Sequence, residues 1–370
     1  MLPVEEPLDA ETRSQLQRIV DYPAFKDAAI VVMPDTHAGK GSVIGFTSPL
    51  GETVIPNIVG VDIGCGIDAY RLGRVEPDFD SFDKQLRQNI PFGHDVRNKP
   101  HKDIQTRTDP FWETAVQSIC DRQKQDYYRV LKSIGTLGGG NHFIEIDRAP
   151  DGDLWLVIHS GSRNFGLQIA TYHQTAAARW LKAEKKTGSF YRDLEYFPID
   201  QGGQAYLDDM KTAQEYAARN RRAMARTLIE GFFKLDPGSL ETVSSVHNYI
   251  NFDDRLIRKG AISAQQGERL IIPLNMRDGT IIGTGKGNPR WNQSAPHGAG
   301  RLMSRTQARA KIDLDDFRST MEGVWSSSVN ERTLDEAPMA YKPSEMIIDA
   351  ISETVDVLFI MKPVYNFKAD

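Results

Sequence analysis

Short apolar segments typical of β-strands alternate irregularly with long amphipathic segments typical of helices along this chain of 370 residues. This irregular order decides the fold class, because a doubly wound parallel sheet requires a helix of similar length after each strand. The sequence therefore predicts an α+β fold, with mixed β-sheets packed by helices in a single compact domain over residues 1–370. We expect strands in 28–33, 52–59, 142–146 and 154–159, and helices in 9–20, 109–134, 166–185 and 204–234.

Aspartates mark the start of two expected helices. Asp9 is placed as the N-cap of the first helix, and Asp109 as the N-cap of the helix over 109–134. Pro110 is then the first helical residue, a position where the missing N–H of proline costs nothing. Between the first two strands, the stretch PDTHAGKGS (34–42) predicts a glycine-rich loop.

Charge and cysteine content limit the environment and the partners of the chain. The formal net charge is −5, so a nucleic acid would have to be held by a local basic surface. No apolar run approaches the ~20 residues that cross a bilayer. The two cysteines are far apart in sequence and do not make a disulfide framework. We therefore expect a cytoplasmic protein with reduced thiols and no membrane partner.

One of these cysteines stands in an open, polar setting. In VGVDIGCGID (59–68), Cys65 has glycine on both sides and follows Asp62 by three residues. A thiolate and a carboxylate at this spacing can face one divalent cation, whereas a buried cysteine in a turn explains the pattern equally well. Cys120 differs, because it lies on the apolar face of a predicted helix and is interpreted as a packing residue.

Five of the eight histidines stand in motifs rich in Gly, Asn, Ser and Arg. They are His37, His142, His159, His247 and His297, whereas His94, His101 and His173 lack such surroundings and are interpreted as surface or packing residues. One histidine at a strand end is more often structural than a ligand. His142, His159 and His247 together, with a cysteine and an aspartate in a matching context, favour a shared metal site.

The ligand types narrow the choice of metal. Close pairs such as CxxC, typical of structural zinc, are absent from the sequence. A carboxylate, a thiolate and scattered imidazoles suit Mn²⁺, Zn²⁺ or Fe²⁺ at a catalytic centre, and one thiolate can bridge two metal ions. Asn141 and Asn248, each beside a histidine, are candidates for supporting the ligands or binding phosphate.

His297 lies in a glycine turn, with Arg301 and Arg305 shortly after it. This arrangement is typical of a nucleophile at a phosphorus centre, with guanidiniums offsetting the developing charge. A glycine turn leading into a helix with exposed arginines explains it as well. Two further basic segments, RNRRAMAR (219–226) and RLIRKG (255–260), are either solvated surfaces or contacts to an RNA backbone.

Taken together and in order, these motifs resemble the RtcB family of RNA-splicing ligases. The resemblance runs from about residue 25 to the C-terminus and rests on MPDTHAGKGSVIG, GVDIGCG, GTLGGGNHFIEI, HSGSR, HNY, RKGAISA, HGAGRLMSRT and APMAYK. It implies an RtcB-like domain with a central metal cleft. It also implies a GTP- and Mn²⁺-dependent ligase that joins RNA 3′-phosphate or 2′,3′-cyclic phosphate ends to 5′-hydroxyl ends, in RNA repair or tRNA splicing. An archease-type activator is a candidate partner.

The resemblance also assigns roles to residues. His297 would carry GMP, which then activates the RNA end as RNA(3′)pp(5′)G, and Asp35 and His37 would support the centre. The implied ligands of two Mn²⁺ ions are Asp62, Cys65, His142, His159 and His247, with Cys65 bridging and its thiol exposed to metal rather than packed. The implied nucleotide-binding residues are Asn141, Glu145, Asn248, Lys259, Arg301 and Lys368, and the implied phosphate or RNA contacts are Arg163 and Arg305.

Two segments depart from the family pattern. IPLNMRDG (272–279) replaces a Pro-Gly-Ser-Met-Gly turn that contacts the nucleotide, and GNPRWNQSAP (287–296) lacks the usual Cys/Ser-rich form. Two alternatives to the ligase therefore stay open. One is a manganese-dependent phosphoesterase that opens cyclic phosphate ends without joining them, and the other is a non-catalytic protein that binds RNA ends.

Overall fold

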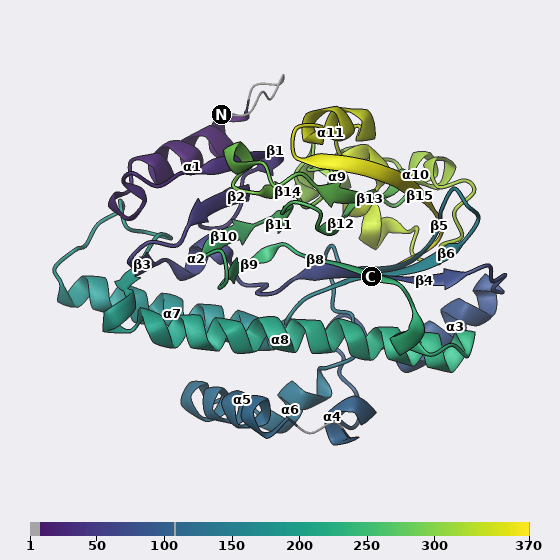
Figure 1. Cartoon of the computed structure of the whole chain (residues 1–370), viewed down its shortest axis with the longest axis horizontal. Helices are drawn as coiled ribbons and strands as arrows, with labels where there is room; N and C mark the ends of the chain where they lie inside the picture. The colour runs from purple at the N-terminus through teal and green to yellow at the C-terminus, as the bar shows by residue number, and fades with distance from the viewer. Residues whose placement is uncertain (1–7, 107–108, 370) are drawn as a thin grey trace.

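The computed structural model describes residues 8–106 and 109–369 of the chain (Figure 1). Within these residues the α-helices are α1 (Ala10–Val20), α2 (Pro56–Val59), α3 (Phe79–Asn89), α4 (Lys102–Thr106), α5 (Pro110–Gln123), α6 (Tyr127–Lys132), α7 (Arg163–Ala183), α8 (Gly203–Leu228), α9 (Arg305–Lys311), α10 (Leu314–Thr320) and α11 (Ser344–Ile351). The strands are β1 (Val31–His37), β2 (Ile44–Pro49), β3 (Thr53–Val54), β4 (Gly66–Gly73), β5 (Phe143–Arg148), β6 (Leu154–Ser160), β7 (Phe197–Pro198), β8 (Thr242–Val246), β9 (Asn248–Asn251), β10 (Leu256–Lys259), β11 (Ala261–Ser263), β12 (Arg269–Asn275), β13 (Gly279–Gly285), β14 (Ser294–Pro296) and β15 (Val355–Lys368).

Two larger sheets organise most of these strands. One has seven strands in the order β12-β13-β15-β5-β6-β4-β8, and the other has four in the order β1-β2-β10-β9. The strands pair antiparallel, including β15 with β5, which are far apart in sequence. The predicted α+β class is confirmed, because antiparallel pairing of distant strands excludes a doubly wound parallel sheet.

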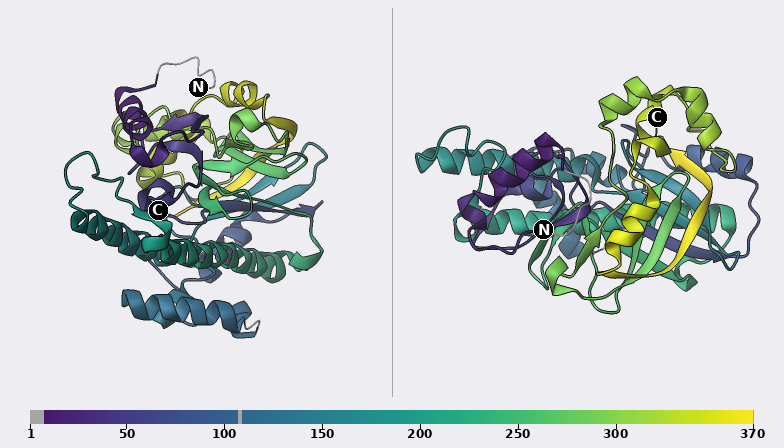
Figure 2. Two further views of the ribbon diagram at one scale, coloured as in Figure 1. Left: turned by 60° about the vertical axis from the view of Figure 1, so that its left-hand side comes forward. Right: turned by 90° about the horizontal axis from the view of Figure 1, so that it is seen from above.

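Long helices cover one side of the seven-stranded sheet. Figure 1 shows α7 and α8 side by side below the strands, with α4, α5 and α6 on their outer side, and Figure 2 shows the same layers from another direction. Ile144 and Ile158 pack with Met224 of α8 in one apolar cluster, whereas Phe143 and Val157 belong to another cluster. β5 and β6 are therefore buried on both faces, so polar side chains on them require partners.

The helix predicted over 109–134 is interrupted. Asp109 accepts a hydrogen bond from the N–H of Trp112, as expected of an N-cap, but α5 ends at Gln123, and its C-cap Lys124 has a φ of 57°. Asp126 then caps the separate helix α6 by accepting from the N–H of Arg129. The spacing of apolar residues did not reveal this break, because the helical pattern of apolar residues continues on both sides of the turn.

Other predicted boundaries also shift. Asp9 caps α1 as expected. The strand predicted over 52–59 is wrong beyond Val54, because Pro56 starts the short helix α2 at a position that suits proline. β1 begins later than predicted and continues to His37, into the segment interpreted as a loop. The helix over 204–234 is confirmed, with a wider final turn over Ile229–Phe233.

Over residues 8–106 and 109–369, none of the helices combines the length and the apolar character needed to cross a bilayer.

Candidate active site

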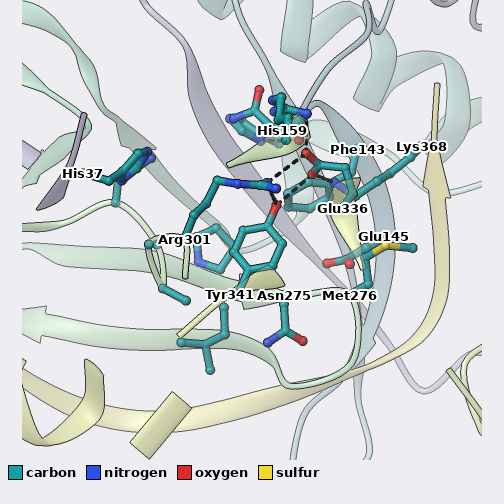
Figure 3. Close-up of a pocket in the computed structure, with 18 residues that line it drawn as sticks. His37, Phe143, Glu145, His159, Asn275, Met276, Arg301, Glu336, Tyr341 and Lys368 are labelled. Carbon is teal, nitrogen blue, oxygen red and sulfur yellow. Dashed lines mark hydrogen bonds and ion pairs between the residues drawn. The ribbon is translucent and has the colours of Figure 1, made fainter. Parts of the chain in front are cut away.

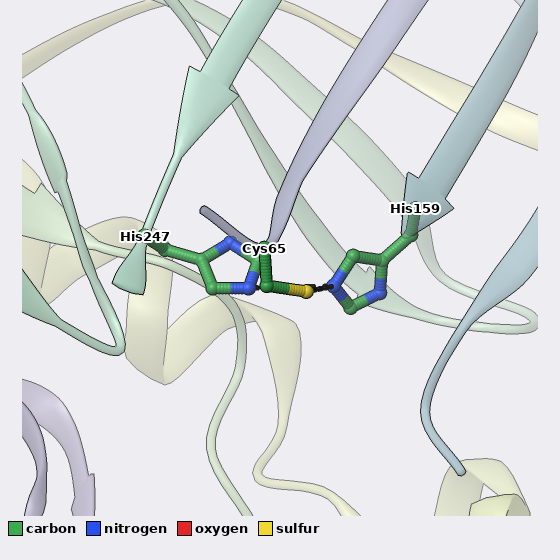
Figure 4. Close-up of side chains that lie close together, drawn as sticks. All are labelled: Cys65, His159 and His247. Atoms are coloured by element: carbon green, nitrogen blue, oxygen red, sulfur yellow. Dashed lines mark hydrogen bonds between the residues drawn. The ribbon is translucent and has the colours of Figure 1, made fainter. Parts of the chain in front are cut away.

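Strand register brings three of the predicted ligands together. Cys65 directly precedes β4, which pairs with β6 so that Ile67 lies opposite His159. On its other edge β4 pairs with β8, placing Gly66 opposite Val246, so that His247 follows at the same end. The N–H of His247 also donates to the carbonyl of Cys65 at 2.9 Å. Figure 4 shows the Cys65 side chain between the two imidazole rings.

All five predicted ligands meet at the Cys65 sulfur. Its Sγ lies 3.2 Å from His159 Nε2 and 3.4 Å from His142 Nε2. Asp62 Oδ2 lies 3.0 Å from His142 Nε2, and His247 Nε2 lies 3.3 Å from His159 Nε2. Two groups result, Cys65 with His159 and His247, and Cys65 with Asp62 and His142, each with ligand atoms within 4.8 Å of one another.

The orientation of the rings fits a cation at this cluster. His142 Nδ1 donates to the carbonyl of Leu137 at 3.0 Å, and His159 Nδ1 to that of Asn141 at 3.1 Å. Their Nε2 lone pairs then face the sulfur, as in metal-binding histidines whose other nitrogen is held by a carbonyl. Burial lowers the pKa of His159 and His247 well below the usual value, so both rings stay neutral. Lone pairs gathered this closely repel one another unless a cation lies among them.

The Cys65 thiol is more enclosed than the sequence indicated. Its flanking glycines predicted an open setting, but the side chain is only 1% exposed. Burial raises the pKa of the thiol well above the usual value, and the Asp62 carboxylate raises it further. A coordinated divalent cation counters both effects, because a coordinating thiol loses its proton. The ligand set therefore fits a metal ion better than a packed thiol.

Close packing explains the glycines in these motifs. A Cβ on Gly64, whose φ is +72°, would lie 2.9 Å from the backbone of Gln214 in α8. A Cβ on Gly161, in HSGSR, would lie 2.1 Å from Asp62 Oδ1. Gly64 therefore lets the segment that carries Cys65 approach α8, and Gly161 lets the segment after His159 approach Asp62.

Gly161→Ala is expected to displace the Asp62 carboxylate and to weaken metal binding by about 10- to 100-fold, as for loss of a group that orients a ligand. Titration of the metal-free protein with Mn²⁺ measures this. Gly139→Ala is the matched control, because the nearest atom to its Cβ would be 4.0 Å away. Equal Mn²⁺ affinity in the two variants would contradict the placement of Asp62.

A second group of residues lies beside the metal cluster. His297 follows β14, and its ring centre lies 4.9 Å from that of His247. Its Nδ1 lies 2.7 Å from Oδ2 of the buried Asp35, so the carboxylate accepts the Nδ1 proton. The other ring nitrogen, Nε2, is then left with its lone pair. Asp35 thus fixes the ring in the tautomer that a nucleophile requires.

His297 is one of the residues that line a cavity. Figure 3 shows this cavity, with Glu336, Tyr341 and Lys368 among the labelled lining residues. Buried Glu336 is part of its lining and lies 2.7 Å from Lys368 Nζ and 2.6 Å from Arg305 Nη1. Burial alone would raise the pKa of Glu336, but Lys368 and Arg305 outweigh it and bring the pKa to about 2. Arg301 donates to the Tyr341 hydroxyl, which in turn donates to Glu336 at 2.8 Å. The cavity wall is therefore a preorganised network of charges.

The remaining predicted residues fall into two groups. The cavity lining includes Asn141, Glu145, Arg301, Arg305 and Lys368 among the predicted residues, and also His37 and His159. Three others have structural partners outside that lining. Arg163 donates to Thr136 Oγ1 and the Gly93 carbonyl, Asn248 Oδ1 accepts from the N–H of Gly260, and buried Lys259 donates to the carbonyls of Lys40, Ser42 and Asn57.

Sequence reasoning did not assign roles to several cavity residues. Phe143 lies in GTLGGGNHFIEI and Tyr341 in APMAYK, so their aromatic side chains within these motifs could have indicated a role in the cavity. Glu336 directly precedes APMAYK and was missed. Pro273 to Met276, in the divergent segment, also line the cavity. The histidines set aside are confirmed as surface or packing residues, because His94 is exposed and His101 and His173 are buried.

An α+β fold that gathers thiol, imidazole and carboxylate donors beside a histidine and a charged cavity has the site of a metalloenzyme. A family model described as "tRNA-splicing ligase RtcB" matches residues 15–369. The chain is 34% identical over 395 residues to the "RNA-splicing ligase RtcB" of Escherichia coli strain K12, covering 98% of this chain and 95% of that protein. It is 28% identical to the "tRNA-splicing ligase RtcB" of Aeropyrum pernix, covering 86% and 82%. The chain belongs to the RtcB family of RNA ligases.

Proposed function

We propose that this ligase uses GTP and Mn²⁺ to join RNA 3′-phosphate or 2′,3′-cyclic phosphate ends to 5′-hydroxyl ends. The observation that carries the proposal is the position of His297, which lies between the thiol–imidazole cluster and the cavity with its Nδ1 bound to Asp35. A carboxylate that holds one imidazole nitrogen raises the nucleophilicity of the other.

The chemistry follows from a nucleophilic His297. Its Nε2 forms a bond to the α-phosphorus of GTP, and the bond to the pyrophosphate oxygen breaks. An oxygen of the RNA 3′-phosphate then attacks the same phosphorus and releases the imidazole, which leaves an RNA(3′)pp(5′)G end. The 5′-hydroxyl of the second RNA attacks the RNA phosphate, and GMP leaves. Water first opens a cyclic phosphate to the 3′-monophosphate.

Asp62, Cys65, His142, His159 and His247 would hold the metal ions, with Cys65 shared between two of them. Bound Mn²⁺ supplies a positive charge that stabilises the charge developing on phosphate oxygens. The sharing of the Cys65 sulfur by both ligand groups supports two ions rather than one. Asn248 and Lys259, which support nearby backbone, are proposed to act on this site through the loops that they hold.

The cavity would hold the nucleotide. Glu145 accepts a hydrogen bond from Asn366 and has a second carboxylate oxygen to offer to the N–H groups of a base. Phe143 and Tyr341 supply aromatic surface for stacking. Asn141, Arg301, Arg305 and Lys368 supply donors for phosphate and sugar oxygens, and Arg163 is proposed to contact RNA phosphate.

A phosphoesterase is the second candidate, since the divergent segment 272–279 contributes Pro273 to Met276 to the cavity. The test uses an RNA with a labelled 2′,3′-cyclic phosphate end and a 5′-hydroxyl partner. With Mn²⁺ and GTP we expect joined RNA, and without GTP only the opened phosphate. Hydrolysis without joining, with or without GTP, would instead support the phosphoesterase, and binding without turnover would support the RNA-end binding protein.

The proposed setting follows from the family. We propose that residues 1–370 act as one ligase domain in the cytoplasm, in RNA repair or tRNA splicing. An archease-type protein is the proposed activator. Adding such a protein to the joining reaction tests this, and we expect more turnovers per enzyme.

A further inference from the structure

The basic segment 219–226 of α8 contains a guanidinium that is not available to RNA. Arg221 is 1% exposed, and its Nη1 donates to the carbonyls of Gly64 at 2.9 Å and Ser160 at 3.1 Å. Gly64 directly precedes Cys65, and Ser160 directly follows His159. One nitrogen therefore joins the backbone just before Cys65 to the end of β6 just after His159, two segments that are far apart in sequence.

The preceding residue continues this link. Asn220 is fully buried, and its Nδ2 donates to Ser160 Oγ at 3.1 Å and to the carbonyl of Gly161 at 3.0 Å. Its Oδ1 accepts from the N–H groups of Gly135 at 2.8 Å and Thr136 at 3.1 Å. All the hydrogen-bonding capacity of this amide is thus used to hold two loops against α8.

These contacts reach a third ligand through one carbonyl. Ser160 Oγ donates to the Leu137 carbonyl at 2.8 Å, which also accepts from His142 Nδ1 at 3.0 Å. The His142 ring is therefore oriented by the Leu137 carbonyl, which is held in place by Ser160 and, through it, by Asn220. Adjacent residues of one helix thus connect the loops of Cys65, His142 and His159.

The charge of Arg221 is matched locally. Its Nε lies 3.0 Å from Oδ1 of Asp68, which also accepts from Ser244 Oγ at 2.6 Å. By contrast, exposed Arg222 pairs with Glu215 at the surface. Burial of a guanidinium is unfavourable because the charged group loses its contacts with water. Since Arg221 donates to two backbone carbonyls instead, its contacts indicate a specific structural role.

We propose that Asn220 and Arg221 are positioning residues of the metal centre, holding the backbone segments that carry Cys65, His142 and His159 at the separation that two metal ions require. This inference rests on the metal centre of the proposed function. It assigns this part of α8 to the centre rather than to an RNA contact, the role left open for the basic segment.

Arg221→Lys tests the proposal, because an ammonium keeps the charge but cannot reach both carbonyls and Asp68 together. We expect a folded protein whose affinity for Co²⁺ falls at least about 10-fold, as for loss of a group that orients ligands. The thiolate-to-cobalt absorption band reports the Cys65 ligand directly and is expected to weaken and shift. Asn220→Asp, which keeps the acceptor but loses the two donated hydrogen bonds, is expected to act in the same direction.

Arg258→Lys is the matched control. Arg258 is also fully buried, and its Nη2 lies 3.0 Å from a single carboxylate, that of Asp254, but its other partners are Tyr249, Ser294 and Gln293. It is expected to lower the melting temperature without changing the cobalt spectrum. A wild-type spectrum and affinity in Arg221→Lys would overturn the proposal, whereas absence of Co²⁺ binding by the wild type would overturn the proposed metal centre as well.

Discussion

The His297→Ala variant is expected to take up no label when it is incubated with Mn²⁺ and α-labelled GTP, whereas the wild type retains label on the protein. The bond to phosphorus would form at Nε2 of this ring, and the rest of the described cavity offers no second imidazole that is paired with a buried carboxylate. Ligation is expected to fall by about 10⁴-fold or more, the scale of loss when a covalent nucleophile is removed.

The stability of the label identifies the linkage. A phosphoramidate on imidazole is expected to survive alkali and to be lost in acid, because protonation makes the ring a good leaving group. Asp35→Asn is expected to reduce labelling by about 10²- to 10⁴-fold, since an amide in place of the carboxylate favours the wrong tautomer. His94→Ala is the control, because His94 is exposed, and it is expected to label like the wild type. Equal labelling of His297→Ala and the wild type would remove the proposed mechanism.

The second large effect is expected from Cys65→Ser. Both ligand groups share the Cys65 sulfur, so one substitution weakens two sites at once. We expect the wild type to retain two Mn²⁺ ions per chain after dialysis and the variant to retain fewer than one, as measured by elemental analysis. Ligation is expected to fall by more than about 100-fold, the upper range for residues that only support a ligand.

The second cysteine provides the control for this experiment. Cys120 is buried in α5 against an apolar cluster and lies outside both ligand groups. Cys120→Ser is expected to lower the free energy of unfolding by about 1–3 kcal/mol, because the serine hydroxyl is buried without a hydrogen-bond partner. The metal content is expected to stay unchanged. If Cys65→Ser kept two ions while Cys120→Ser lost them, the assignment of the bridging thiol would be wrong.

Much of the site could be predicted from residue types and their motifs. Asp62, Cys65, His142, His159 and His247 were selected from the sequence, and the structure brings their ligand atoms together. The glycines next to these ligands indicated that the backbone is closely packed there. The distances from a Cβ on Gly64 to Gln214 and from a Cβ on Gly161 to Asp62 explain this. Helix starts at Asp9 and Asp109 were also readable, because capping is a local interaction.

The break at Lys124 and the short helix at Pro56 had local signals, the Asp126 cap and a proline at a helix start, but apolar patterns that continue across both positions concealed them. Other features depend on contacts between distant segments and left no local signal. Arg221 looks in sequence like its neighbour Arg222, but one points into the ligand loops and the other to the surface. The charges of Arg301 and Arg305 are likewise engaged by Glu336 and Asp335, which sequence order does not reveal.

The donor set, the nucleophile candidate and the family could be recognised from residue types and their order, because these depend only on which side chains are present and where. The folded chain was needed to show that the thiol is enclosed, that Asp35 holds His297, and that α8 links the segments that carry Cys65 and His159. The physical reason is that hydrogen bonds and burial act over a few ångströms in space, whichever residues the antiparallel strands and the long helix bring together.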